Sequence, residues 1–176
     1  FLPGIKIPRQ IQITHDLNSA VSGKDIIIIA VPSLHMREVL KKIKLTDYPR
    51  KALYLSVTKG IETASLKRMS EVIHQELGSG LKLAVLSGPT IAQEIAQGIP
   101  TTAVIASRDK KIRKFLQDIF MTDEFRIYTS DDIAGVELGG SLKNVIAIAC
   151  GISDGLGFGT NTKAALLARG LSEISR

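Results

Sequence analysis

Ile26-Ile-Ile-Ile-Ala-Val31, followed at once by Pro32, is the stretch that decides the fold of this chain. An uninterrupted apolar run of this length is typical of a strand buried on both faces of a parallel sheet. Proline ends such a strand because it cannot donate a hydrogen bond to the ladder. We therefore expect a strand at 26–31, followed by a basic amphipathic helix from Ser33 to Lys44.

Apolar runs and helical patterns alternate on both sides of this stretch. The further expected strands are a short candidate at 11–13 and runs at 52–57, 83–86, 102–106 and 125–129. The further expected helices are 16–22, 65–77, 90–97 and 109–121. Thr90 with Gln93 fits a capping box at the start of the 90–97 helix. Alternation of this kind predicts an α/β fold, in which a doubly wound, mostly parallel sheet has right-handed crossovers.

The pattern changes at residue 131, after which only two helices are expected, around the glycine-rich segment 151–159. We therefore predict a sheet domain over 1–130 and the start of an all-helical domain over 131–176. The chain begins with Phe and stops inside a helical pattern, so we expect it to be an internal piece of a longer protein.

Composition narrows the class of protein. With 44% hydrophobic and 23% charged residues, the chain is an ordinary globular sequence. The net charge of +6 is compatible with anionic ligands, but 5% aromatics and no Trp argue against nucleic-acid binding. The single Cys150 cannot form an internal disulfide, which favours a reducing compartment. The run 26–31 is too short to cross a membrane, so no membrane span is expected.

Three turns are expected to share one edge of the sheet, because parallel strands all end on the same side. They follow the strands at 26–31, 52–57 and 83–86, and they contain Ser33, Lys59, and Gly88 with Thr90. Ligands of open α/β sheets bind at this edge. Lys59 is thus either a ligand contact or a surface lysine in a turn. Gly88 and Thr90 are equally explained as a turn glycine and a helix N-cap.

The helix expected over 139–149 has two unlike faces. An apolar stripe runs along Leu138, Leu142, Val145, Ile146, Ala149 and Ile152, and we expect it to enter a core. The opposite face is small except for Lys143 and Asn144. Lys143 either points at a ligand that approaches this face or extends to water beside a neighbouring helix. If Lys143 and Lys59 face one cleft, each disfavours the charged form of the other, and a lysine of lowered pKa can exchange protons with a substrate oxygen.

The histidines show no metal-ligand spacing, so no metal site is expected. A Gly-x-Gly-x-x-Gly turn is absent from the sequence. The glycines at 155–159 follow a helix rather than a strand, which is the wrong context for a dinucleotide site.

Three motifs together resemble the bacterial type of NAD(P)-dependent glycerol-3-phosphate dehydrogenase. They are Thr58-Lys-Gly-Ile-Glu62, Leu86-Ser-Gly-Pro-Thr-Ile-Ala92 and Gly135-Val-Glu-Leu-Gly-Gly-Ser-Leu-Lys-Asn-Val-Ile-Ala-Ile148. The run from Asp154 to Glu173 is similar to the same family. The resemblance implies a Rossmann-like dinucleotide-binding domain, here over 1–130 without its first strands and glycine turn, and a helical substrate domain starting at 131. It also implies a cytoplasmic enzyme of glycerophospholipid synthesis and is compatible with a homodimer.

The resemblance assigns roles to six residues. Lys143 would be the catalytic acid/base in the interconversion of dihydroxyacetone phosphate and sn-glycerol 3-phosphate. Substrate contacts would come from Lys59, Gly88, Thr90, Lys143 and Asn144, and contacts to NADH or NADPH from Lys59 and Ala92. The alternatives are a related dehydrogenase acting on β-hydroxy acids and a basic, non-enzymatic binding module. The family's glycine turn and its phosphate-clamping cluster are missing, so we expect these 176 residues to bind cofactor poorly and to turn over little or nothing by themselves.

Overall fold

The computed structural model describes residues 3–46 and 48–176. Five strands form one sheet in the order β1-β2-β3-β4-β5. Their bounds are Ile26–Ile29 (β1), Leu53–Ser56 (β2), Lys82–Ser87 (β3), Thr101–Ala106 (β4) and Phe125–Ser130 (β5). The helices are Leu17–Val21 (α1), Met36–Lys44 (α2), Met69–Leu77 (α3), Ala92–Ala96 (α4), Lys110–Phe120 (α5), Ile133–Gly155 (α6) and Thr160–Ile174 (α7), with a 3-10 turn at Ser33–His35. The expected α/β fold is confirmed.

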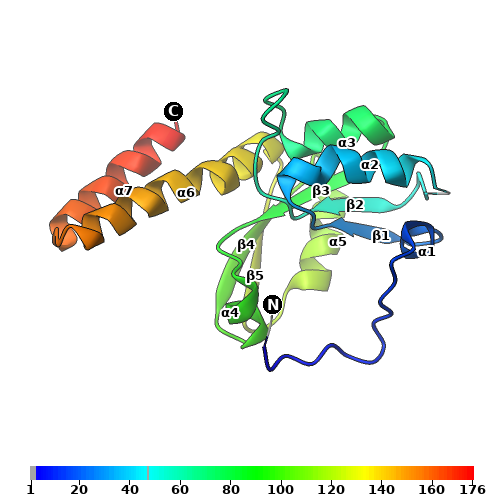
Figure 1. Cartoon of the computed structure of the whole chain (residues 1–176), viewed down its shortest axis with the longest axis horizontal. Coiled ribbons are helices and arrows are strands. Elements are labelled where there is room, and N and C mark those ends of the chain that lie inside the picture. The colour runs from blue at the N-terminus through cyan, green and yellow to red at the C-terminus, as the bar shows by residue number, and fades with distance from the viewer. Residues whose placement is uncertain (1–2, 47) are drawn as a thin grey trace.

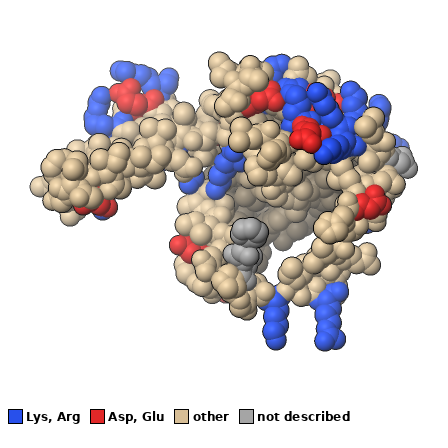
Figure 2. Space-filling model, in the orientation of Figure 1, with Lys and Arg blue, Asp and Glu red and all other residues tan. Residues whose placement is uncertain are grey.

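The sheet separates two apolar cores. Helices α2 and α3 cover one face, where Met36, Leu40, Tyr54 and Ile73 are fully buried. Helix α5 covers the other face and buries Leu116 against the strands (Figure 1). Helices α6 and α7 leave the sheet as an arm of two packed helices. Figure 2 shows mixed charges over the α2 and α3 side, whereas most of the arm is uncharged.

The sheet is not parallel throughout, because β4 runs antiparallel to β3. Strands β1, β2 and β3 are parallel to one another, and β4 is parallel to β5. The reason lies in α4, which has five residues and a length of about 7.5 Å. Such a helix cannot carry the chain back along β3, whose six residues span about 20 Å. The expectation that all strands end at one edge is therefore wrong beyond β3.

Three further expectations fail for local reasons. Residues 11–13 form no strand, and Ile13 is 75% exposed. Ile28 is 50% exposed, because β1 is an edge strand and α5 packs on β3, β4 and β5. The capping box of Thr90 does not form, since α4 begins at Ala92 and has no side-chain cap.

The apolar stripe of α6 also lies differently from expectation. Ile146 packs closely on Gly170 of α7. The other large members of the stripe are exposed, Val145 by 65% and Ile152 by 59%. The helix instead turns its small face to the sheet, where Gly140 is buried. By length and composition α6 is also apolar enough to cross a membrane, a test that core helices pass as well, so the expected absence of a span stays a prediction.

An ion-pair cluster ties α2 and α3 to the loop after β2. Arg37 donates to both carboxylate oxygens of Glu62, at 2.8 and 2.7 Å, and also pairs with Glu76. The hydrogen bond from Arg37, assisted by one from Ser65, lowers the pKa of Glu62 to about 2. The hydrogen bonds that Arg37 makes with Glu62 and Glu76 raise the pKa of Arg37.

This cluster predicts acid sensitivity. The pKa of Glu62 is below its ordinary value of 4.5, so its stabilising contribution is complete above that pH and is lost as the pH falls toward 2. We expect the melting temperature to fall more steeply over this range in the natural chain than in Glu62→Gln. Glu94→Gln, at an exposed carboxylate, is the matched control and should keep the steep fall. Equal slopes for all three proteins would contradict the prediction.

Candidate active site

The turns after β2 and β3 meet at one edge of the sheet, as the sequence predicts. Lys59 follows β2, and its ammonium donates to the carbonyl oxygen of Gly88 at 2.7 Å and to the hydroxyl of Thr90 at 3.1 Å. Both acceptors lie just after β3. The hydroxyl of Thr90 is thus used to hold Lys59 rather than to cap α4. An ammonium group has three donors, so one N–H of Lys59 remains for a ligand.

The turn after β1 joins the same edge. A side chain at Gly60 would place its Cβ 2.8 Å from the hydroxyl oxygen of Ser33. Gly60 also has φ +126°, a conformation in which other residues are strained. The glycine after Lys59 therefore allows the loop to pass close to the start of the 3-10 turn at Ser33–His35.

Gly88 packs closely against β4. A Cβ at this position would lie 2.6 Å from the carbonyl oxygen of Thr102 and 2.9 Å from the Cα of Ala103. Backbone atoms cannot move aside as a flexible side chain can. Only glycine fits here. The close packing fixes its carbonyl oxygen, which accepts the hydrogen bond from the ammonium of Lys59.

Helix α6 approaches this edge through its small face. A Cβ on Gly140 would lie 2.1 Å from the hydroxyl oxygen of Ser87 and 3.9 Å from Cγ of Lys59. One residue later, the hydroxyl of Ser141 accepts the backbone N–H of Gly60 at 3.1 Å. The Lys59 loop and α6 are thus joined by a hydrogen bond and by close packing.

Lys143 lies half-buried on α6, two residues beyond Ser141. Burial, and secondarily the positive charge of Lys143, lower the pKa of Lys59 from its ordinary value. The positive charge of Lys143 therefore reaches Lys59 across this edge. The side chain of Lys143 has no hydrogen bond or ion pair with the rest of the described chain.

The structure brings only some of the six predicted residues close to one another. Lys59, Gly88 and Thr90 are in direct contact, with Lys143 close enough to influence Lys59. Asn144 is exposed on α6 and has no hydrogen bond to them within the described residues, and Ala92 is the exposed first residue of α4.

Sequence reasoning missed a buried carboxylate that holds α6 in place. Glu137 is 8% exposed and accepts from the backbone N–H of Ser70 at 2.7 Å and from its hydroxyl at 2.6 Å. It also pairs with Arg68 at 2.9 Å. A signal was present, since a lone carboxylate between Val136 and Leu138 lies on the same helical face as Ser141 and Asn144.

Comparison with known proteins identifies the family of the chain. Residues 1–113 match the family model described as NAD-dependent glycerol-3-phosphate dehydrogenase N-terminus, and residues 132–176 match the corresponding C-terminus model. The chain belongs to this dehydrogenase family. The family is therefore neither of the two alternatives, a dehydrogenase acting on β-hydroxy acids or a basic, non-enzymatic binding module.

Relatives within the glycerol-3-phosphate dehydrogenase family are similar over nearly the whole chain. A glycerol-3-phosphate dehydrogenase [NAD(P)+] of Thermoanaerobacter sp. is 51% identical over 98% of this chain and 51% of its own length. One of Bacillus subtilis is 47% identical over 100% and 51%. The crystal structure of glycerol-3-phosphate dehydrogenase from Coxiella burnetii has a TM-score of 0.91 and 40% identity, and covers 100% of this chain and 53% of that chain. The chain therefore spans about half the length of the relatives it matches.

Proposed function

We propose that this chain supplies the catalytic lysine and part of the substrate edge of an NAD(P)-dependent glycerol-3-phosphate dehydrogenase. The reaction is the interconversion of dihydroxyacetone phosphate and sn-glycerol 3-phosphate, in the cytoplasm, for glycerophospholipid synthesis. The observation that carries the proposal is the meeting of Lys59, held by Gly88 and Thr90, with the half-buried Lys143 of α6. The division into a dinucleotide-binding part, 1–130, and a helical part from 131 follows the end of β5 at Ser130 and the start of α6 at Ile133.

The two lysines have different surroundings and therefore different proposed roles. Lys143 has no partner in the described chain, so its ammonium is available to give a proton to the carbonyl oxygen in reduction and to take it back in oxidation. Lys59 is already anchored, so its remaining N–H positions an oxygen of the substrate. Gly88, Thr90 and Asn144 complete the proposed substrate contacts.

The residues present fit one part of a nicotinamide cofactor's site. NADH or NADPH supplies the hydride when bound. Lys59 and the exposed residue Ala92 follow the carboxyl ends of β2 and β3, at the edge where dinucleotides bind in open α/β sheets. The sequence 1–176 has no Gly-x-Gly-x-x-Gly turn for the pyrophosphate, so these residues hold only a share of the cofactor.

A hybrid protein tests the proposal. The chain would be extended at both ends with the corresponding segments of the Thermoanaerobacter relative, and nicotinamide absorbance would be followed with dihydroxyacetone phosphate. We expect oxidation of NADH or NADPH that depends on this substrate, and none with a β-keto acid, the oxidised form of a β-hydroxy acid. A folded hybrid that binds cofactor but leaves dihydroxyacetone phosphate unchanged would refute the proposal.

A further inference from the structure

A cavity lies at the opposite edge of the sheet from Lys59. Its volume is about 700 Å³, within the range of small-molecule sites. It is bordered by α3, by the start of β3, and by the segments that lead from β4 into α5 and from β5 into α6. Because β4 and β5 run against β3, their carboxyl ends face this edge. The reversal of the sheet therefore gives the molecule a second edge of the kind at which α/β proteins bind ligands.

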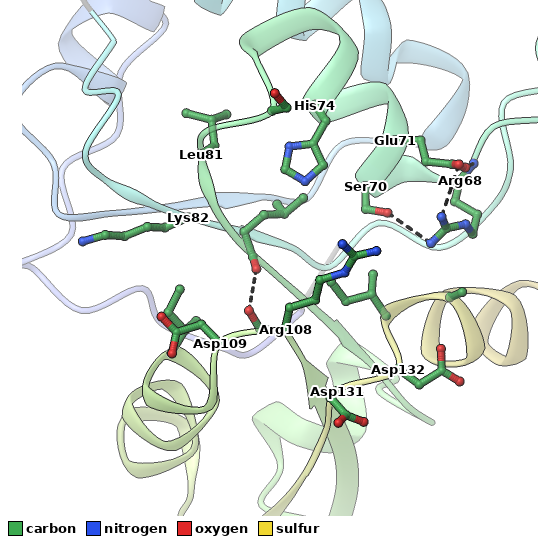
Figure 3. A pocket seen from close by; sticks show the side chains of 16 residues that line it. Arg68, Ser70, Glu71, His74, Leu81, Lys82, Arg108, Asp109, Asp131 and Asp132 are labelled. Carbon is green, nitrogen blue, oxygen red and sulfur yellow. Dashed lines mark hydrogen bonds and ion pairs between the residues drawn. The ribbon is translucent and has the colours of Figure 1, made fainter.

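Basic side chains gather on one wall of this cavity. In Figure 3 the guanidinium of Arg108 lies between His74 and the guanidinium of Arg68. Arg68 is neutralised by Glu71 at 3.2 Å and by Glu137 at 2.9 Å. The side chain of Arg108 has no hydrogen bond or ion pair within residues 3–46 and 48–176. The five N–H donors of this exposed guanidinium are therefore free to hold an anion.

The acidic residues of the lining do not supply that anion. Asp109 and Asp132 cap α5 and α6, accepting from the backbone N–H groups of Lys111 at 2.7 Å and Gly135 at 2.8 Å. In Figure 3 the carboxylates of Asp131 and Asp132 lie on the far side of the cavity from the Arg108 guanidinium. The charge of Arg108 is therefore left for a ligand.

The lining also includes Lys82, three serines (Ser70, Ser79 and Ser107) and a group of apolar side chains. The apolar side chains are those of Leu81, Leu83, Ile112, Ile133 and Ala134. A bare oxyanion would leave these surfaces in contact with water, whereas an anion that carries a small apolar group covers them. We propose that this cavity binds a phosphate monoester with a compact apolar group, its phosphate held by Arg108. The ligand would contact Ile133 and Ala134, the first turn of the helix that carries Lys143.

Phenyl phosphate is the probe, with the labelled 176-residue chain observed by backbone amide chemical shifts. We expect millimolar phenyl phosphate to move the amides of 107–109 and 131–134 in a saturable way. Inorganic phosphate should bind more weakly because it lacks the apolar part. Arg108→Gln should weaken phenyl phosphate binding at these amides by about tenfold or more, the loss of one charge-assisted contact. Arg126→Gln, at an exposed arginine of β5 outside the cavity, should leave binding unchanged.

Three results would overturn the proposal. They are unmoved amides at 107–109 and 131–134, equal affinity in Arg108→Gln, and tighter binding of benzylamine, which would assign the cavity to cations through Asp131. Shifts confined to Lys59 and Gly88 would place phosphate binding at the candidate active site alone. That last result would end this proposal while leaving the proposed dehydrogenase function intact.

Discussion

Lys143→Met in the extended hybrid enzyme is expected to lower kcat by about 10²- to 10⁴-fold while cofactor affinity is kept. The half-buried Lys143 is the unpartnered ammonium that α6 brings to the Lys59 edge. Methionine has a similar length and no proton to exchange, so it removes the proposed acid/base group with little change in volume. Steady-state rates with dihydroxyacetone phosphate, and cofactor titrations by fluorescence, measure the two quantities separately.

Two further variants are compared with Lys143→Met. They are Lys59→Met, at the second lysine of the site, and Lys110→Met, a control. Lys59 is proposed to position substrate, so its loss should raise KM at least as much as it lowers kcat. Lys110, exposed on α5, should be replaceable without effect on either constant. Wild-type kcat in Lys143→Met would remove Lys143 from the mechanism. A large fall in Lys110→Met would show that the assay reports lost folding.

Glu137→Ala is expected to reduce the free energy of unfolding by about 2–3 kcal/mol. The carboxylate is 8% exposed, and its removal leaves both donors of Ser70 without their acceptor and Arg68 paired with Glu71 alone. Ser70 is itself 3% exposed, so water replaces the lost partner poorly. Urea titrations followed by circular dichroism give the free energy directly.

Two variants control for the change of side chain. Glu137→Gln keeps an acceptor for Ser70 and loses only the charge, so its cost should be smaller than that of alanine. Glu173→Ala, at an exposed ion pair on α7, should change the free energy of unfolding by less than about 1 kcal/mol. A cost for Glu137→Ala as small as that of Glu173→Ala would mean that Glu137 does not fasten α6 to α3.

The sequence predicted the parts of the fold that depend on local patterns. The apolar runs give all five strands, and the strand–turn boundaries place Lys59 and Gly88 at one edge, where the structure joins them by a hydrogen bond. The pairing of Lys59 with Thr90 was not predicted, because the hydroxyl of a threonine before a helix is more often a cap.

The remaining errors concern which surface an element meets. Ile28 has the pattern of a core strand, but its burial depends on what covers β1. The orientation of α6 depends on Gly140, whose lack of a side chain permits contact with Ser87, and on Glu137, which binds α3. The hydrophobic period of the α6 sequence predicts that the opposite face is buried. It therefore does not reveal these long-range contacts.

The anchoring of Lys59 has a consequence for the energetics of ligand capture. A free lysine side chain carries about 2 kcal/mol of rotamer entropy, which a ligand must overcome when it fixes that side chain. Here Gly88 and Thr90 fix the ammonium during folding. The molecule therefore meets its ligand with this donor preorganised, and the entropic cost falls on the stability of the fold instead of on affinity.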